Sequence, residues 1–133
     1  MSLKSLNKTQ KAAVEAIDGP VLIFAGAGSG KTRVLTHKLY YLVDEGLFKP
    51  EEILAVTFTN KAAKEMKERV MKLLKTNELD LSMGTFHSIC ARILREDIEV
   101  LGFSRHFAIY DVKDQLDLIK AVSYTHLTLP TNG

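Results

Sequence analysis

Residues 25–32 read A-G-A-G-S-G-K-T, and their types suit the binding of phosphate groups. A short apolar run at 21–24 comes directly before them, and a segment compatible with a helix follows. A strand, a glycine-rich turn ending in Lys-Thr and a helix form the layout of a P-loop, which holds the phosphates of a nucleoside triphosphate. The first position of the usual pattern G-x-x-x-x-G-K-T is taken by Ala25, a small residue that still fits the end of a strand.

Each residue type in this loop contributes to phosphate binding in its own way. Glycine permits backbone conformations that a side chain blocks, so that loop N–H groups and the positive end of the next helix converge on anionic oxygens. Lys31 is expected to reach the β- and γ-phosphates, and the hydroxyl of Thr32 is expected to ligate Mg²⁺. An ordinary glycine-rich turn is disfavoured by the three glycines, Lys-Thr and the flanking pattern together. The predicted phosphate site consists of Ala25, Gly26, Ala27, Gly28, Ser29, Gly30, Lys31 and Thr32.

The composition is that of an ordinary soluble protein. The 133 residues suffice for about one domain, and the contents of 46% hydrophobic and 26% charged residues are typical of globular chains. A net charge of +2 is too small to argue for nucleic-acid binding by itself. No apolar run approaches the length of a membrane span, so we expect a cytoplasmic protein without a membrane partner. The single cysteine, Cys90, is expected to be a buried, inert thiol, and the histidines lack the spacing of metal ligands.

Alternating apolar patterns predict an α/β layered fold with a largely parallel sheet. Strands are expected at 21–24, 53–58, 81–85 and 107–110. Helices are expected at 6–17, 31–45, 60–75, 86–101 and 113–121. The first helix carries Gln10 on its apolar face, where a polar amide is either satisfied locally or directed at a bound group.

The end of the second predicted strand is a candidate for nucleic-acid contact. Residues 57–66 join this strand to a helix, which is where open α/β sheets place ligands. Phe58 offers a face for base stacking, and the hydroxyl of Thr59 and the backbone N–H groups near Asn60 suit phosphates. Helix 60–75 carries six basic residues against two acidic ones. A solvated helix face is the ordinary interpretation of such a run, and a core position for Phe58 also stays open.

A second junction between a strand and a helix reads G-T-F-H-S at residues 84–88. Gly84 permits close backbone approach, and Thr85, His87 and Ser88 supply small polar groups near a helix N-terminus. Taken alone, this pattern is more often an N-capped helix start than a binding site.

Four motifs in order now carry a family resemblance. The chain resembles the N-terminal part of UvrD/PcrA/Rep-like superfamily 1 DNA helicases. The resemblance rests on L-N-x-x-Q at 6–10, A-G-A-G-S-G-K-T, T-F-T-N-K-A-A-x-E-M and G-T-F-H-S. The match extends over essentially residues 1–122. It implies a partial RecA-like motor domain, ATP and Mg²⁺ as cofactors, and ATP-driven 3′-to-5′ translocation along single-stranded DNA in an enzyme of the DNA-repair type.

The resemblance also assigns roles to individual residues. Gln10 is similar to the family's adenine-reading glutamine, and Arg33 is expected near the base. Lys31 and Thr32 correspond to the catalytic lysine and the magnesium-binding threonine. Contacts to single-stranded DNA or to single/double-strand junctions are implied for Phe58, Thr59, Asn60, Lys61, Thr85, Phe86 and His87.

Part of the family's catalytic machinery does not occur in the sequence. ATP hydrolysis also needs an acidic Mg²⁺ partner, a group that orients water and positive charge for the transition state. The family supplies these with a D-E-x-x-D segment and arginines, whereas here Asp111 is followed by Val112. We therefore expect the rest of the helicase chain to be missing, little turnover, and an exposed sheet edge beside the loop strand.

The predicted organisation follows from this comparison. Residues 1–110 form the partial RecA-like motor domain and 111–122 begin an accessory subdomain. Residues 123–133 contain no Asp, Glu, Lys or Arg and resemble a tail read through from a sequencing adapter, so a non-native tail is expected there. The alternatives are a helicase with a fused nuclease, another P-loop enzyme such as a small-molecule kinase, and a non-catalytic nucleotide- or DNA-binding fragment.

Overall fold

A computed structural model describes residues 2–26, 28 and 30–128. The chain divides into two compact units, Met1–Ile93 and Leu94–Gly133. The predicted nucleotide and DNA residues all belong to the first unit, although Ala27 and Ser29 of the loop lie outside the described residues.

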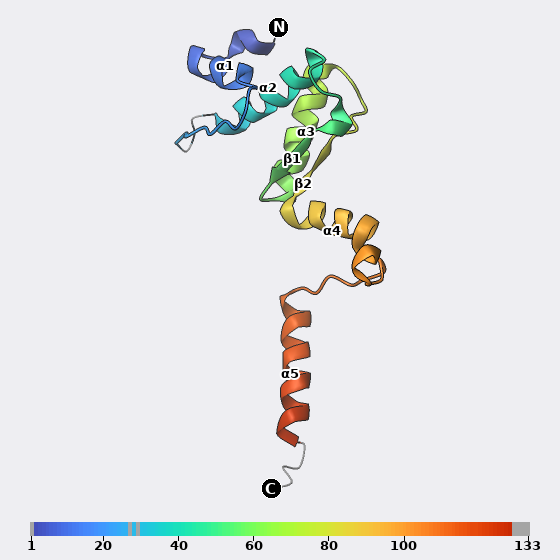
Figure 1. Cartoon of the computed structure of the whole chain (residues 1–133). Helices are drawn as coiled ribbons and strands as arrows, with labels where there is room; N and C mark the ends of the chain where they lie inside the picture. The colour runs from blue at the N-terminus through green and yellow to red at the C-terminus, as the bar shows by residue number, and fades with distance from the viewer. Residues whose placement is uncertain (1, 27, 29, 129–133) are drawn as a thin grey trace. The chain divides into compact units, whose positions relative to one another are not determined.

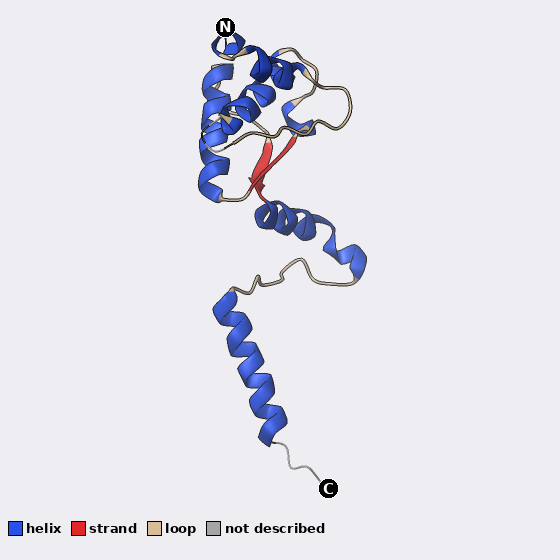
Figure 2. Ribbon diagram, turned by 90° about the vertical axis from the view of Figure 1, so that its left-hand side faces the viewer, coloured by secondary structure: helices blue, strands red, loops and turns tan. Residues whose placement is uncertain are grey.

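The first unit combines three packed helices with a short parallel sheet. Helix α2 (Lys31–Asp44) lies between α1 (Lys8–Glu15) and α3 (Asn60–Leu74), as Figure 1 shows. Strands β1 (Leu54–Thr57) and β2 (Ser82–Thr85) pair in parallel and contact α3 (Figure 2). Short 3₁₀ turns precede α1 (η1, Ser2–Ser5) and β1 (η2, Pro50–Glu52). The prediction of an α/β fold with a parallel sheet is confirmed.

The core of this unit lies between α3, α2 and the two strands. On α3, Met66 and Val70 are four residues apart and therefore lie on one helix face, where they are almost completely buried. Strand β1 contributes Ala55, and the segment before β2 contributes Leu81. The complete buried cluster is Leu39, Ile53, Ala55, Met66, Val70, Leu79 and Leu81. This packing fixes the position of α3 on the sheet.

A lysine on α2 caps the end of α1. The last carbonyl groups of a helix lack acceptor partners within it, and a cation near them is favourable. Lys38 Nζ donates to the carbonyl oxygen of Ala13 at 3.0 Å and also to that of Ala16. Lys38 is half-buried, and this burial lowers the pKa of its ammonium below the ordinary value of 10.5.

We predict that Lys38→Met lowers the free energy of unfolding by about 1.5 kcal/mol, because two hydrogen bonds from a charged donor are lost. Between the lowered pKa and 10.5 the unfolded chain binds more protons than the folded one, so the parent chain gains stability as pH rises through that window. Lys38→Met loses this gain. Urea unfolding between pH 7 and 10.5 measures both effects, with Lys120→Met on an exposed helix as control. Equal midpoints for the two variants contradict the cap.

The apolar segment before the loop differs from its prediction. Residues 21–24 form no strand, and all four side chains are exposed, with Phe24 at 91% and Leu22 at 79% of their full accessible surface. A strand needs a neighbour for its backbone hydrogen bonds, and the only strands in the described residues, β1 and β2, pair with each other. The predicted strand at 21–24 is therefore wrong for this structure, and its unpaired apolar edge is open to solvent.

Helical segments follow β2 along the chain. Helix α4 (Phe86–Asp97) continues into a 3₁₀ turn, η3 (Ile98–Leu101), and α5 spans Val112–Thr128. The predicted strand at 107–110 is irregular, because like 21–24 it has no neighbouring strand among the described residues. Helix α5 continues past residue 122, while 129–133 lie outside the described residues; the domain boundaries and the non-native tail stay predictions.

The prediction that Cys90 is a buried thiol is wrong. Cys90 is exposed, whereas its neighbour Ile89 is buried at 5% of its accessible surface. The apolar stripe of α4 is broad, but only part of it is covered: Ile93 and Leu94 also face solvent. Among the helices of the described residues, none is both long and apolar enough to cross a membrane.

Candidate nucleotide and nucleic-acid sites

The N-terminus of α2 has the backbone geometry of an anion site. Gly30 is the N-cap of α2 with φ of 84°, and Gly28 has φ of 75°, both in the left-handed region that glycine adopts without strain. Because Gly30 has no side chain, it cannot accept from the first N–H groups of the helix, which leaves them for a ligand. Lys31 and Thr32, in the first turn, are exposed. In the described part of the predicted phosphate loop, two glycines therefore have left-handed backbone conformations and the first helical turn after them is exposed.

Gln10 lies beside this helix start. Its side-chain carbonyl accepts from the backbone N–H of Asn7 at 3.1 Å, and its own N–H donates to Asn7 Oδ1 at 2.8 Å. This reciprocal pair is a capping box that begins α1. The amide Nε2 of Gln10 lies 3.1 Å from the point where a Cβ on Gly30 would stand. Asn7 was not among the predicted site residues, although the pattern N-x-x-Q is the signal of such a box.

Arg33 joins the same group of residues. Its Nη2 donates to the carbonyl oxygen of Ser5 at 2.8 Å and so ties the first turn of α2 to the segment before α1. One turn further, His37 Nδ1 donates to the carbonyl oxygen of Arg33 at 2.8 Å. Gln10, Gly30 and Arg33, predicted separately as nucleotide residues, are thus brought together.

We predict that Gly30→Ala lowers the affinity for a fluorescent ATP analogue at least tenfold. A side chain at φ of 84° costs about 1–2 kcal/mol, and its Cβ would also press on Gln10 Nε2. Gly19→Ala is a matched control, because Gly19 has φ of 74° but no neighbour within 4 Å of an added Cβ. Both variants should lose stability in thermal unfolding, and only Gly30→Ala should lose affinity. Equal affinities for the two variants contradict this assignment.

The two predicted DNA junctions meet at one edge of the sheet. Thr57, the last residue of β1, is paired in register with Thr85, the last residue of β2. Phe58 and Phe86 follow directly, and their rings lie 6.0 Å apart between centroids with planes inclined by 54°. Phe58 is 92% exposed and Phe86 is 55% exposed. The core position left open for Phe58 is therefore excluded.

The threonines at these junctions act as helix caps. Thr59 Oγ1 accepts from the N–H of Ala62 at 3.1 Å and is the N-cap of α3. Thr85 Oγ1 accepts from the N–H of Ser88 at 3.2 Å, and Ser88 Oγ donates to the carbonyl oxygen of Thr85 at 3.0 Å. Both hydroxyls are thus engaged within the chain, as N-capping predicts.

The groups left for a ligand at this edge are aromatic rings and polar side chains. Asn60, Lys61 and His87 are exposed beside the two phenylalanine rings. The first turns of α3 and α4 also direct their positive ends to the same edge of the sheet, because each helix follows a parallel strand. This edge therefore combines stacking surface with sites for phosphate oxygens.

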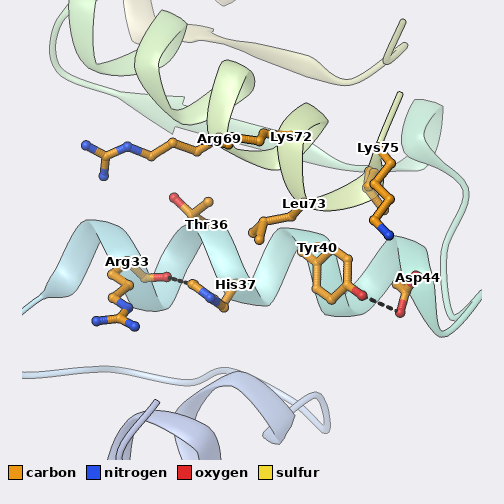
Figure 3. A pocket seen from close by; sticks show the side chains of 10 residues that line it. Arg33, Thr36, His37, Tyr40, Asp44, Arg69, Lys72, Leu73 and Lys75 are labelled. Carbon is orange, nitrogen blue, oxygen red and sulfur yellow. Dashed lines mark hydrogen bonds between the residues drawn. The ribbon is translucent and has the colours of Figure 1, made fainter. Parts of the chain in front are cut away.

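A cavity of about 730 Å³ lies elsewhere, between α2 and α3 (Figure 3). Of the predicted site residues it includes only Arg33. On the side of the cavity formed by α2, the Tyr40 hydroxyl donates a hydrogen bond to Asp44 Oδ2 at 2.8 Å. Lys72 and Lys75 line the other side near the C-terminus of α3, where cations complement the helix dipole. The cavity is thus separate from the phosphate loop.

No cluster of three or more His, Cys, Asp or Glu side chains that could hold a metal ion occurs in the described residues. The side chains in the described residues therefore fit Mg²⁺ only where phosphate oxygens supply further ligands, and the exposed Thr32 hydroxyl would be the protein ligand.

Comparison with a family model and with known proteins gave consistent matches. A family model described as the UvrD/REP helicase N-terminal domain matches residues 6–132. ATP-dependent DNA helicase PcrA of Bacillus subtilis (strain 168) is 55% identical over 120 residues, and PcrA of Staphylococcus aureus (strain Mu50) is 54% identical over 120 residues. Each alignment covers 90% of this chain but only 16% of the relative. The chain thus spans a small part of the length of these relatives.

Proposed function

The chain belongs to the UvrD/REP helicase family, and from this premise we propose that it is the ATP-binding N-terminal part of a DNA helicase. The complete protein moves 3′ to 5′ along single-stranded DNA in this proposal. The relatives named ATP-dependent DNA helicase PcrA support the activity, and we place it in the cytoplasm. A small-molecule kinase is disfavoured by the family membership.

ATP binding rests on the group of residues around the start of α2. In this proposal the N–H groups of the first turn and Lys31 bind phosphate oxygens, and the Thr32 hydroxyl holds Mg²⁺. Gln10 and Arg33 lie beside the loop and contact the base. Bound ATP supplies the free energy of phosphoryl transfer that drives movement.

DNA binding rests on one observation above all, the contact between the Phe58 and Phe86 rings at the ends of two parallel strands. An exposed aromatic ring at the end of a strand offers a face on which a base can stack. In this proposal Asn60, Lys61 and His87 bind the neighbouring phosphates, whereas Thr59 and Thr85 shape the two helix starts.

The rest of the motor lies in the longer protein. We propose that residues 21–24 pair there with strands that this chain does not contain, since their apolar side chains are exposed. The acidic Mg²⁺ partner and the arginines for the transition state are supplied from the same remaining part.

We predict that the 133-residue chain binds an ATP analogue but turns over little ATP. Lys31→Ala should weaken analogue binding at least tenfold, because the ammonium contact to the β- and γ-phosphates is lost. Fluorescence titration measures affinity, and a coupled phosphate-release assay measures turnover. Sustained ATPase activity that Lys31→Ala abolishes would contradict the prediction of low turnover. Unchanged affinity of Lys31→Ala for the analogue would contradict the proposed nucleotide site.

We predict that Phe58→Ala weakens binding of a fluorescent dT oligonucleotide about 5- to 150-fold, because base stacking contributes about 1–3 kcal/mol per base. Its stability should not change, since the side chain is 92% exposed. Phe103→Ala is a matched control, because Phe103 is 65% exposed and belongs to the other compact unit of the chain. Unchanged affinity with reduced stability would argue against the stacking role.

A further inference from the structure

We propose that Phe86 is a positioning residue, which holds the Phe58 ring ready for a base and does not stack on DNA itself. The inference rests on the proposed function, in which the strand ends bind single-stranded DNA. It separates two phenylalanines to which the sequence assigned the same role.

The ring geometry leaves no room for a base between the two phenylalanines. A base held between two rings needs nearly parallel planes about 7 Å apart, twice the stacking distance of about 3.4 Å. The rings of Phe58 and Phe86 are 6.0 Å apart and inclined by 54°, which is a direct tilted contact. The accessible surface for a base is therefore the outer part of the Phe58 ring, which is 92% exposed.

More of the side chain is covered in Phe86 than in Phe58, since Phe86 is 55% exposed and Phe58 is 92% exposed. Phe86 is the first residue of α4, and the turn around it is fixed by the hydrogen bonds between Thr85 and Ser88. Gly84 lets this turn lie close to β2, since a Cβ there would stand 2.5 Å from Ser88 Oγ. Ile89, one turn along α4, is buried.

Phe58 differs from Phe86 in its side chain rather than in its backbone, since Thr57 Oγ1 donates to the carbonyl oxygen of Thr59 at 2.9 Å and holds the turn around Phe58. Phe58 lies between the end of β1 and Thr59, the N-cap of α3, and nearly all of its side chain is in solvent. A free aromatic side chain loses rotamer freedom when a base stacks on it, and that loss weakens binding. The contact with Phe86 restricts the Phe58 ring before DNA arrives, so the loss on binding is smaller.

A double-mutant cycle on the 133-residue chain tests this role. We expect Phe86→Ala to weaken dT-oligonucleotide binding about three- to tenfold in the parent chain, and to have no further effect in the Phe58→Ala background. Quenching of a 2-aminopurine base by stacking should fall in Phe86→Ala and be retained in Phe86→Tyr, which keeps the ring. ATP-analogue affinity and circular dichroism should stay unchanged in each variant.

The outcomes separate this inference from the proposed function. Equal loss of affinity by Phe86→Ala in both backgrounds means that Phe86 contacts DNA itself, and overturns the inference alone. Unchanged affinity and quenching in Phe86→Ala also overturn it. Should Phe86→Ala unfold, Phe86→Leu enters the cycle with the same expectation. Absence of DNA binding by the parent chain, or no effect of Phe58→Ala, overturns both proposals.

Discussion

The proposed nucleic-acid site at the ends of β1 and β2 depends on one interaction, the packing of α3 against these two paired strands. Met66 and Val70 of α3 lie on the strands through one continuous buried cluster. Because the strands are parallel and end at the paired residues Thr57 and Thr85, the next residue of each reaches the same edge. A one-residue slip in register would separate Phe58 from Phe86, since successive residues of a strand point to opposite faces.

The predicted nucleotide residues at the start of α2, Gln10, Gly30 and Arg33, are held in place by different contacts. The loop is not supported by a strand in the described residues, and its position follows from α2, which packs between α1 and α3. The Asn7–Gln10 capping box and the hydrogen bond from Arg33 to Ser5 hold α1 and the segment before it against the start of α2. Helix ends and side-chain hydrogen bonds thus organise the loop locally, while its apolar lead-in stays exposed.

Much of this arrangement could be predicted, for identifiable reasons. The helices at 31–45 and 60–75 and the strands at 53–58 and 81–85 were found within a few residues, since their apolar periodicity is strong. The strands expected at 21–24 and 107–110 were not, because a strand exists only with a partner and a run of apolar residues does not reveal whether one is present. Cys90 was misplaced for a similar reason: helical periodicity marks an apolar face but not what covers it.

The sequence by itself determined which residue types are available for chemistry: a glycine-rich loop followed by Lys31 and Thr32, predicted to bind phosphates, and two strand-to-helix junctions with aromatic residues. Those are local properties, set by residue type and spacing along the chain. Only the tertiary structure decided that Phe58 is exposed, that its ring touches Phe86, and that the hydroxyls of Thr59 and Thr85 serve as helix caps. These facts depend on parallel register and on packing between distant segments, and such contacts leave no periodic pattern in the sequence.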